Sequence, residues 1–120
     1  MIRNFNIPTI ISASFNVYNC ANILKSRQQV SRYVIVLCDL LELERKSPCI
    51  NKKFDYNGNT GFYYHQYTPT SNINGYAIES ENKLYMDIMS YTKFDPQLVS
   101  NFTMDLLKAK DVEHKSNIRY

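Results

Sequence analysis

Few side chains in this 120-residue chain are suited to acid–base or nucleophilic chemistry at neutral pH. The two histidines, His65 and His114, are the only side chains that normally titrate there. Neither has a second histidine or a cysteine at the spacing of metal ligands, so a zinc site has no support and both fit structural or surface positions. The three cysteines, Cys20, Cys38 and Cys49, form no CxxC pair, and Cys38 falls in an apolar stretch where a free thiol packs as a small hydrophobe. A Cys–His nucleophile pair stays open, although no spacing points to one.

A serine in a short polar break is the other candidate for chemistry. The segment from Pro69 to Gly75 consists of small and polar residues, and it places Ser71 between two predicted strands. From composition alone this segment predicts an ordinary loop. The three glycines, Gly58, Gly61 and Gly75, match neither a Walker phosphate loop nor a dinucleotide fingerprint, so nucleotide-phosphate hydrolysis has no support.

Charge and composition narrow the possible partners and compartment. Fourteen basic and eleven acidic side chains give a net charge of +3 and are scattered, whereas nucleic-acid-binding domains are usually more basic. The odd number of cysteines favours a reduced, cytoplasmic compartment. Met1 to Pro8 carries too many polar residues for a signal peptide, and the longest apolar run, Tyr33 to Cys38, is too short for a membrane span. We therefore expect a single cytoplasmic domain over residues 1–120 with no membrane partner.

The elements that must position these residues begin with a strand and a long helix. Thr9 to Tyr18 is rich in β-forming residues. Asn19 can cap a helix that continues to about Arg45, before Ser47-Pro48 stops it. An apolar stripe at helical spacing is formed by Val30, Val34, Leu37 and Leu41.

The second half of the chain predicts two hairpins, a second helix and a last strand. The hairpin strands are expected at Cys49 to Tyr56, Gly61 to Thr68, Tyr76 to Glu79 and Leu84 to Tyr91. Asn57-Gly58-Asn59, between the first two, is the strongest turn signal in the sequence. Asp95-Pro96 starts the helix, whose apolar face is expected at Leu98, Phe102 and Leu106. Val112 to Ile118 closes the chain as a strand.

The resulting order, β-α-β-β-β-β-α-β, predicts an α+β fold. We expect a two-layer sandwich in which an antiparallel sheet carries both helices on one face. The other face would then be wet or covered by a partner. A homodimer that pairs sheet faces or edges would supply that cover.

In the order of its motifs the chain resembles the short prokaryotic and phage S-adenosylmethionine decarboxylases, from Thr9 almost to the C-terminus. SFNVYNCANIL resembles the family's first strand and the turn into its long helix. GFYYHQYTPTSNINGYAIE resembles the strand–serine–strand segment that is cut during maturation. KLYMDIMSYTKFDPQLVSNF resembles the strand with the catalytic cysteine and the following "DP" helix, and LLKAKDVEHKSNIRY resembles the closing strand. The order and spacing of the four segments carry the resemblance.

The resemblance implies a pyruvoyl cofactor made from the chain itself. In the family the serine hydroxyl attacks the preceding carbonyl, and the resulting ester eliminates to leave an N-terminal pyruvoyl group. On this sequence the serine is Ser71, and the cut falls between Thr70 and Ser71. The ketone forms a Schiff base with the substrate amine and acts as the electron sink for decarboxylation. The resemblance thus implies a homodimeric lyase that decarboxylates S-adenosylmethionine, or a related amino acid, for polyamine (spermidine) biosynthesis.

Two positions of the family's catalytic pattern hold tyrosine in this sequence. The family's processing histidine lies five residues after the serine, at Tyr76, and its proton-donating cysteine falls at Tyr91. The acidic residue often found before the serine is replaced by Pro69-Thr70. A tyrosine stays protonated at neutral pH, so it can donate a proton but is a poor base. We therefore expect cleavage at Thr70–Ser71 to be partial or slow.

The resemblance also predicts how the site is assembled. We expect Ser71, Tyr76 and Tyr91 to converge on one cavity, with some of its residues supplied by the partner chain. Glu79 or Glu81 would lie nearby and bind the ribose or the amine of the substrate.

Self-cleavage further requires a turn that holds Ser71 against the Thr70 carbonyl. Gly75 and the polar Asn72 and Asn74 would allow a tight turn, and the amides of these asparagines are possible donors to the developing oxyanion.

Three functions from different classes remain open at this point. The first is a divergent self-processing decarboxylase. The second is an unprocessed homologue that binds the same ligand as a regulatory partner or runs another reaction. The third is a single-stranded RNA-binding module, because Thr60 to Tyr67 loosely fits an aromatic RNA-binding strand. That segment lacks the leading basic residue and the extra hairpin does not fit the βαββαβ order, so nucleic acid is the least expected partner.

Overall fold

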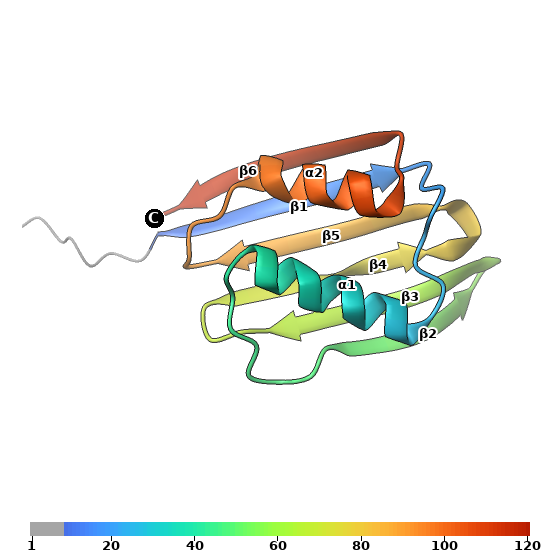
Figure 1. Cartoon of the computed structure of the whole chain (residues 1–120), viewed down its shortest axis with the longest axis horizontal. Helices are drawn as coiled ribbons and strands as arrows, with labels where there is room; N and C mark the ends of the chain where they lie inside the picture. The colour runs from blue at the N-terminus through green and yellow to red at the C-terminus, as the bar shows by residue number, and fades with distance from the viewer. Residues whose placement is uncertain (1–8) are drawn as a thin grey trace, which may run out of the picture.

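The computed structural model describes residues 9–120, in which six strands form one antiparallel sheet with two helices on one face (Figure 1). The strands are β1 (Ile10–Tyr18), β2 (Ile50–Tyr56), β3 (Asn59–Tyr67), β4 (Ser71–Ile78), β5 (Lys83–Ser90) and β6 (Asp111–Arg119), and the helices are α1 (Arg27–Leu40) and α2 (Pro96–Leu107). Neighbouring strands pair antiparallel in the order β2-β3-β4-β5-β1-β6. This confirms the predicted α+β class and order of elements, whereas the prediction for Met1 to Pro8 lies outside the described residues.

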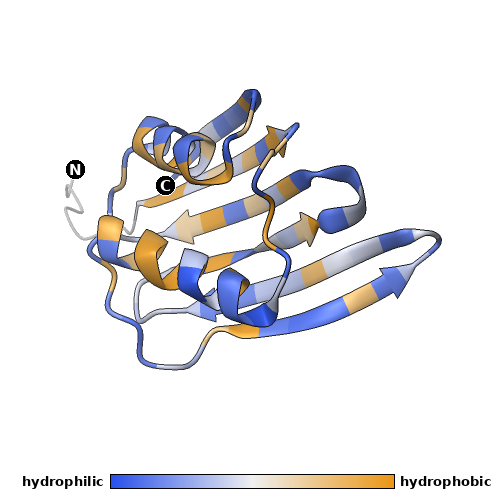
Figure 2. Cartoon of the chain, turned by 45° about the vertical axis from the view of Figure 1, so that its right-hand side comes forward, coloured by the Kyte–Doolittle hydropathy of each residue, from blue (hydrophilic) through white to orange (hydrophobic). Residues whose placement is uncertain are grey.

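The sheet has one covered face and one open face. Successive side chains of a strand point to opposite sides, so the strands alternate in hydropathy (Figure 2). The side that faces the helices holds the core, for example Leu84, Met86 and Ile88 of β5. No element among residues 9–120 covers the other side. We call this side the open face; its central residues are Tyr63, His65, Asn72, Asn74, Tyr76, Tyr85, Asp87 and Met89.

The turn between β2 and β3 follows the sequence prediction. Asn57 and Gly58 both have positive φ, 54° and 84°, and the flanking Tyr56 and Asn59 are paired. Two successive positive φ angles are typical of the type I′ hairpin turn, which suits the twist of the strands. The Asn-Gly signal therefore correctly placed the first hairpin.

Helix α1 is shorter than the sequence predicted. It begins at Arg27, where the hydroxyl of Ser26 accepts the Gln29 backbone N–H at 3.1 Å, so Ser26 rather than Asn19 is the cap. Asn19 instead ends β1 with a φ of 55°. The residues between these positions are not helical. The backbone N–H groups of Cys20 and Ala21 instead donate to the carbonyls of Asn82, after the short 3-10 turn η1 (Glu79–Glu81), and of Lys108, after α2, at 2.9 and 3.1 Å. The predicted stripe is confirmed, since all four of its residues are buried: Val30, Val34, Leu37 and Leu41.

Helix α2 begins as predicted but buries a different face. The Asp95 carboxylate accepts the Gln97 backbone N–H at 2.9 Å, and Pro96 is the first helical residue. The predicted apolar stripe is wrong at Leu98 and Leu106, which are 42% and 39% exposed, whereas Phe102 packs against the core as expected. The buried residues are Val99, Ser100, Thr103 and Leu107. Two of these buried residues are polar and hydrogen-bond side chains of other elements, which the sequence pattern does not reveal. Thr103 bonds the Tyr33 hydroxyl and Ser100 bonds His114, both at 2.8 Å.

Strand β4 begins five residues earlier than predicted. Only Pro69 and Thr70 form the connection, because Thr68 and Ser71 are joined by N–H···O bonds of 2.9 and 3.4 Å. The expected polar break from Pro69 to Gly75 is therefore mostly strand. Gly75 is needed for close packing rather than for a turn, since a Cβ there would lie 2.5 Å from the Tyr64 hydroxyl.

Candidate functional site

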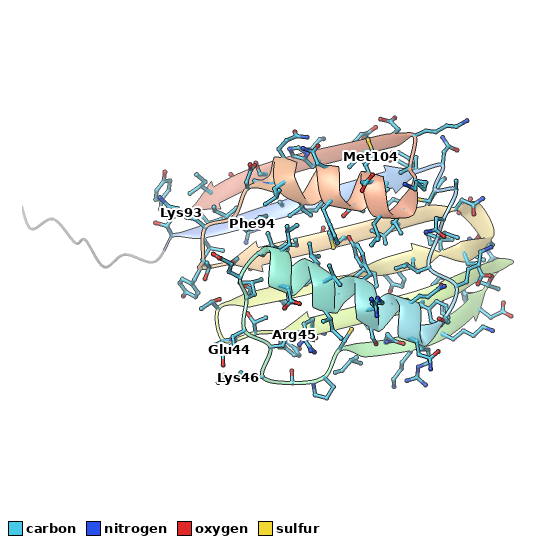
Figure 3. All side chains as sticks on the ribbon, in the orientation of Figure 1. Glu44, Arg45, Lys46, Lys93, Phe94 and Met104 are labelled. Atoms are coloured by element: carbon cyan, nitrogen blue, oxygen red, sulfur yellow. The ribbon has the colours of Figure 1, made fainter. Side chains whose placement is uncertain are left out.

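Ser71 lies at the end of the sheet where β4 begins, β5 ends and β1 begins (left in Figure 1). It is 7% exposed and faces the helix layer. The antiparallel register pairs it with Ser90, the last residue of β5, and the two Oγ atoms are 2.6 Å apart. The chain then leaves this end of the sheet through Lys93 and Phe94, which Figure 3 labels before α2. The fold thus encloses the Ser71 hydroxyl beside another hydroxyl.

Four hydroxyl-bearing residues surround the predicted cleavage site. We call Thr70, Ser71, Ser90 and Thr92 the hydroxyl cluster. Thr92 Oγ1 donates to Thr70 Oγ1 at 3.0 Å, and Thr70 Oγ1 lies 3.3 Å from Ser71 Oγ. Ser90 Oγ donates to the Thr92 carbonyl at 2.7 Å and accepts the Thr92 N–H at 2.9 Å. Sequence reasoning missed Ser90 and Thr92, because only the hairpin register brings them to Ser71.

The carbonyl that Ser71 would attack has a backbone donor. The Tyr91 N–H donates to the Thr70 carbonyl oxygen at 2.9 Å. An N–H group in this position stabilises negative charge as it develops on the oxygen. The sequence prediction gave this role to Asn72 and Asn74, but both are strand residues whose side chains bond on the open face, Asn72 Oδ1 to His65 at 2.9 Å. The observed donor is one the sequence pattern did not single out.

Tyr91 lies at the same end of the sheet as Ser71. Tyr91 is 56% exposed. It lines a shallow depression of about 180 Å³ together with Ser71, Ser90 and Thr70. Other lining residues come from both faces of the sheet end: Ile10, Pro69, Asn72 and Met89. A ligand or a partner chain on the open face can therefore approach Ser71.

Tyr76 does not share this depression within one chain. It follows Ser71 by five positions on β4, so it points to the other side of the sheet. It is 47% exposed on the open face and packs on Phe54 and Tyr63, with ring centroids 5.6 and 5.3 Å apart. Within one chain Tyr76 therefore does not join Ser71 and Tyr91, because the strand continues regularly through the segment predicted as a turn.

Glu79 and Glu81 are also distant from Ser71 within one chain. They form the short turn η1 (Glu79–Glu81) that joins β4 to β5 at the other end of these strands. Eight residues of extended chain separate Ser71 from Glu79, which corresponds to roughly 25 Å. Glu81 Oε2 lies 3.9 Å from Lys83 Nζ in a solvated pair. The expectation that either residue lies beside Ser71 is not met in a single chain.

No histidine or ionised thiol lies at Ser71 among residues 9–120. His65 bonds Asn72 on the open face, and His114 bonds Ser100 under α2. Burial raises the pKa of Cys20 and of Cys38 to about 11, so both remain thiols at neutral pH. Burial also raises the pKa of the Cys49 thiol, and the two histidine rings bond Asn72 and Ser100 rather than a thiol. A Cys–His nucleophile pair therefore has no support, and the hydroxyl of Ser71 is the nucleophile candidate.

Residues 9–120 contain no group of three or more His, Cys, Asp or Glu side chains arranged to hold a metal ion. In the same residues, neither helix has the length and apolar character needed to cross a membrane.

Comparison with known proteins identifies the family. A comparison with curated proteins gave no match. The sequence model of the S-adenosylmethionine decarboxylase family matches residues 12–120, which include both helices, strands β2 to β6, all of β1 except its first two residues, and the hydroxyl cluster at Ser71. The match therefore extends over most of the chain, and it agrees with the six-stranded α+β architecture. This chain belongs to the S-adenosylmethionine decarboxylase family.

Proposed function

We propose that the protein is a divergent S-adenosylmethionine decarboxylase that cleaves itself slowly between Thr70 and Ser71. The observation that carries the proposal is the pair of contacts at this peptide bond. The Ser71 hydroxyl is held by the hydroxyl cluster, and the Thr70 carbonyl accepts the Tyr91 N–H at 2.9 Å. Nucleophile and electrophile of the cleavage reaction are thus both held by neighbouring residues. The proposed product serves polyamine (spermidine) biosynthesis in the cytoplasm.

The cleavage reaction follows from these two groups. Ser71 Oγ forms a bond to the Thr70 carbonyl carbon, the C–N bond breaks, and the hydroxyl proton is taken up by the departing nitrogen. This gives an ester and a free amine at Ser71. Loss of the Ser71 Cα proton then expels the Thr70 carboxylate from Cβ. Water finally replaces the nitrogen, which leaves as ammonia, and a pyruvoyl group remains.

The residues at Ser71 fit such a group. Its ketone would supply an electron sink for amino-acid decarboxylation. Tyr91 lines the same depression and its phenol can donate a proton at the substrate carbon. The group would lie beside the open face, from which a small amino-acid substrate can enter.

The missing histidine supports slow rather than fast maturation. Neither histidine ring hydrogen-bonds Ser71 or Thr70 among the described residues, since His65 bonds the Asn72 side chain on the open face and His114 bonds Ser100. General acid–base help is typically worth about 10²–10⁴-fold in rate. Attack by Ser71 would therefore precede a slow elimination.

We further propose that the protein is a homodimer in which a partner supplies Tyr76 to the Ser71 site. Tyr76 belongs to the open face and cannot reach Ser71 in its own chain. Asn72 and Met89 of the open face also line the depression at Ser71, so a partner on this face would border the site. Glu79 and Glu81 could contact a substrate only across the same interface.

Intact-mass spectrometry of the purified protein at neutral pH tests the proposal. We expect the slow appearance of two fragments, residues 1–70 and 71–120, the second lighter by one ammonia than simple hydrolysis would give. Ser71→Ala should stay intact. Release of CO₂ from carboxyl-labelled S-adenosylmethionine should rise with the cleaved fraction.

A wild-type chain that stays intact for days would point to the second candidate function, an unprocessed homologue that binds the same ligand. The observation that favours this candidate is that neither histidine ring hydrogen-bonds Ser71 in the described chain. Calorimetric titration of the intact protein with S-adenosylmethionine would then show binding without turnover.

A further inference from the structure

We infer that Ser90 is the positioning residue that aims the Ser71 hydroxyl for attack on the Thr70 carbonyl. The inference rests on the proposed self-cleavage, which requires an oriented Ser71 hydroxyl. It gives this orienting role to a residue that the resemblance to the family did not single out. Ser90 ends β5 and is 2% exposed. Its Oγ lies 2.6 Å from Ser71 Oγ, and the antiparallel register places the two residues directly opposite each other.

The hydrogen bonds of Ser90 fix which hydroxyl donates. A serine hydroxyl has one proton to donate and two lone pairs that accept. Ser90 uses its proton on the Thr92 carbonyl at 2.7 Å and one lone pair on the Thr92 N–H at 2.9 Å. Only an acceptor site remains toward Ser71. Ser71 must therefore donate its own proton to Ser90.

Ser71 Oγ keeps one lone pair that no hydrogen bond uses. Thr92 Oγ1 donates to Thr70 Oγ1, so the Thr70 proton is free to point at Ser71 Oγ, 3.3 Å away. Donation therefore runs in one direction, from Thr92 through Thr70 and Ser71 to Ser90. With its proton on Ser90 and one lone pair on Thr70, Ser71 keeps a single lone pair for the bond to carbon.

The Ser90–Thr92 turn holds both reacting groups. Through Ser90 it orients the Ser71 hydroxyl, and through the Tyr91 N–H it polarises the Thr70 carbonyl. Ser71 and Ser90 are both buried, so water does not compete for these bonds. Ser90 is a neutral acceptor and takes no part as a base. Its role is to orient the Ser71 hydroxyl proton before Ser71 Oγ bonds to the Thr70 carbonyl carbon.

The experiment compares the attack step in three Ser90 variants and a control. Hydroxylamine captures the ester as a Thr70 hydroxamate, so attack is measured without the later elimination. We expect Ser90→Ala to lower this trapping rate by about tenfold or more, since one orienting hydrogen bond is lost. Ser90→Thr keeps the hydroxyl and should recover most of the rate, and Ser90→Cys should lie between.

Ser100→Ala is the matched control, because it also removes a buried serine hydroxyl with one side-chain partner, His114. It should lower the thermal unfolding midpoint but leave trapping unchanged. Equal trapping by Ser90→Ala and the wild type would overturn the inference while self-cleavage stands. Absence of trapping in the wild type would instead overturn the proposed function, and the inference with it. If Ser90→Ala does not fold, equal rates for Ser90→Cys and Ser90→Thr would count against the inference.

Discussion

Tyr91 serves the proposed reaction through two different groups. Its backbone N–H donates to the Thr70 carbonyl, whereas its exposed side chain lines the depression at Ser71. A change of side chain therefore separates cleavage from decarboxylation, because any residue except proline keeps the N–H group.

We expect Tyr91→Phe to cleave at a rate within about twofold of the wild type and to decarboxylate about 10²–10⁴-fold more slowly, as for loss of a general acid. Intact mass measures the first rate and release of labelled CO₂ the second. Tyr91→Cys, which restores the family residue, should raise decarboxylation. A parallel fall of both rates in Tyr91→Phe would contradict this division.

The buried thiols make stability depend on alkaline pH. Burial raises the pKa of Cys20 and of Cys38 from 9.0 to about 11, and it raises the pKa values of the Tyr33 and Tyr64 phenols in the same direction. The unfolded chain therefore loses these protons first as pH rises. The stabilisation is complete below about pH 9 and is lost toward pH 11.

We accordingly expect the urea midpoint to fall between pH 9 and 11, in the window set by the two thiols. The double variant Cys20→Ala/Cys38→Ala should show a shallower fall over the same range. An identical pH dependence in both proteins would show that the thiols are not the cause.

At the scale of elements, hairpin register brings the site together. The pairing of β4 with β5 places Ser71 opposite Ser90, and the turn after β5 adds Tyr91 and Thr92. A shift of the register by one residue would move Ser71 to the open face. Every second side chain of β5 is buried against the helices, and this burial therefore also keeps Ser71 opposite Ser90.

Helix α1 offers a test of element boundaries. Ser26 caps the helix, whereas Asn19 has a left-handed backbone at the end of β1. We expect Ser26→Ala to lower the free energy of unfolding by about 1 kcal/mol, the usual effect of losing a cap. Asn19→Gly should be close to neutral, since glycine adopts positive φ readily. Urea denaturation measures both, and a larger loss in Asn19→Gly would favour the longer helix that the sequence predicted.

At the scale of the whole molecule, the open face is the surface that a second copy of the chain would bind. It carries Tyr76 in contact with Phe54 and Tyr63, and it borders the depression at Ser71. An exposed aromatic cluster on an uncovered sheet suits burial in an interface. Assembly and catalysis would then depend on the same residues.

We expect the wild type to be a dimer by light scattering at micromolar concentration and Tyr76→Lys to be largely monomeric, because a buried lysine in the interface is strongly unfavourable. Met104→Lys is the control, since Met104 is 37% exposed on the helix side of the molecule (Figure 3). The monomeric variant should also lose decarboxylation. A clean wild-type monomer would contradict the proposed assembly.

The sequence determined the order of elements, the fold class and the family by itself. The family followed from the order and spacing of four longer segments. The order of elements and the fold class followed from local signals: the Asn57-Gly58 turn, the Asp95-Pro96 helix start and the buried stripe from Val30 to Leu41. Each depends on residues close together in the chain, so pattern and propensity suffice.

Only the tertiary structure decided which residues meet at Ser71. Ser90 lies nineteen positions away and joins the site through strand register, while Tyr76 lies five positions away and leaves it because strand side chains alternate. The polar composition of Pro69 to Gly75 predicted a loop, but pairing with β3 and β5 on both sides satisfies the backbone of Ser71 to Gly75 as a strand. Pairing between distant segments outweighed the local composition, and this pairing cannot be read from the residues of one segment alone.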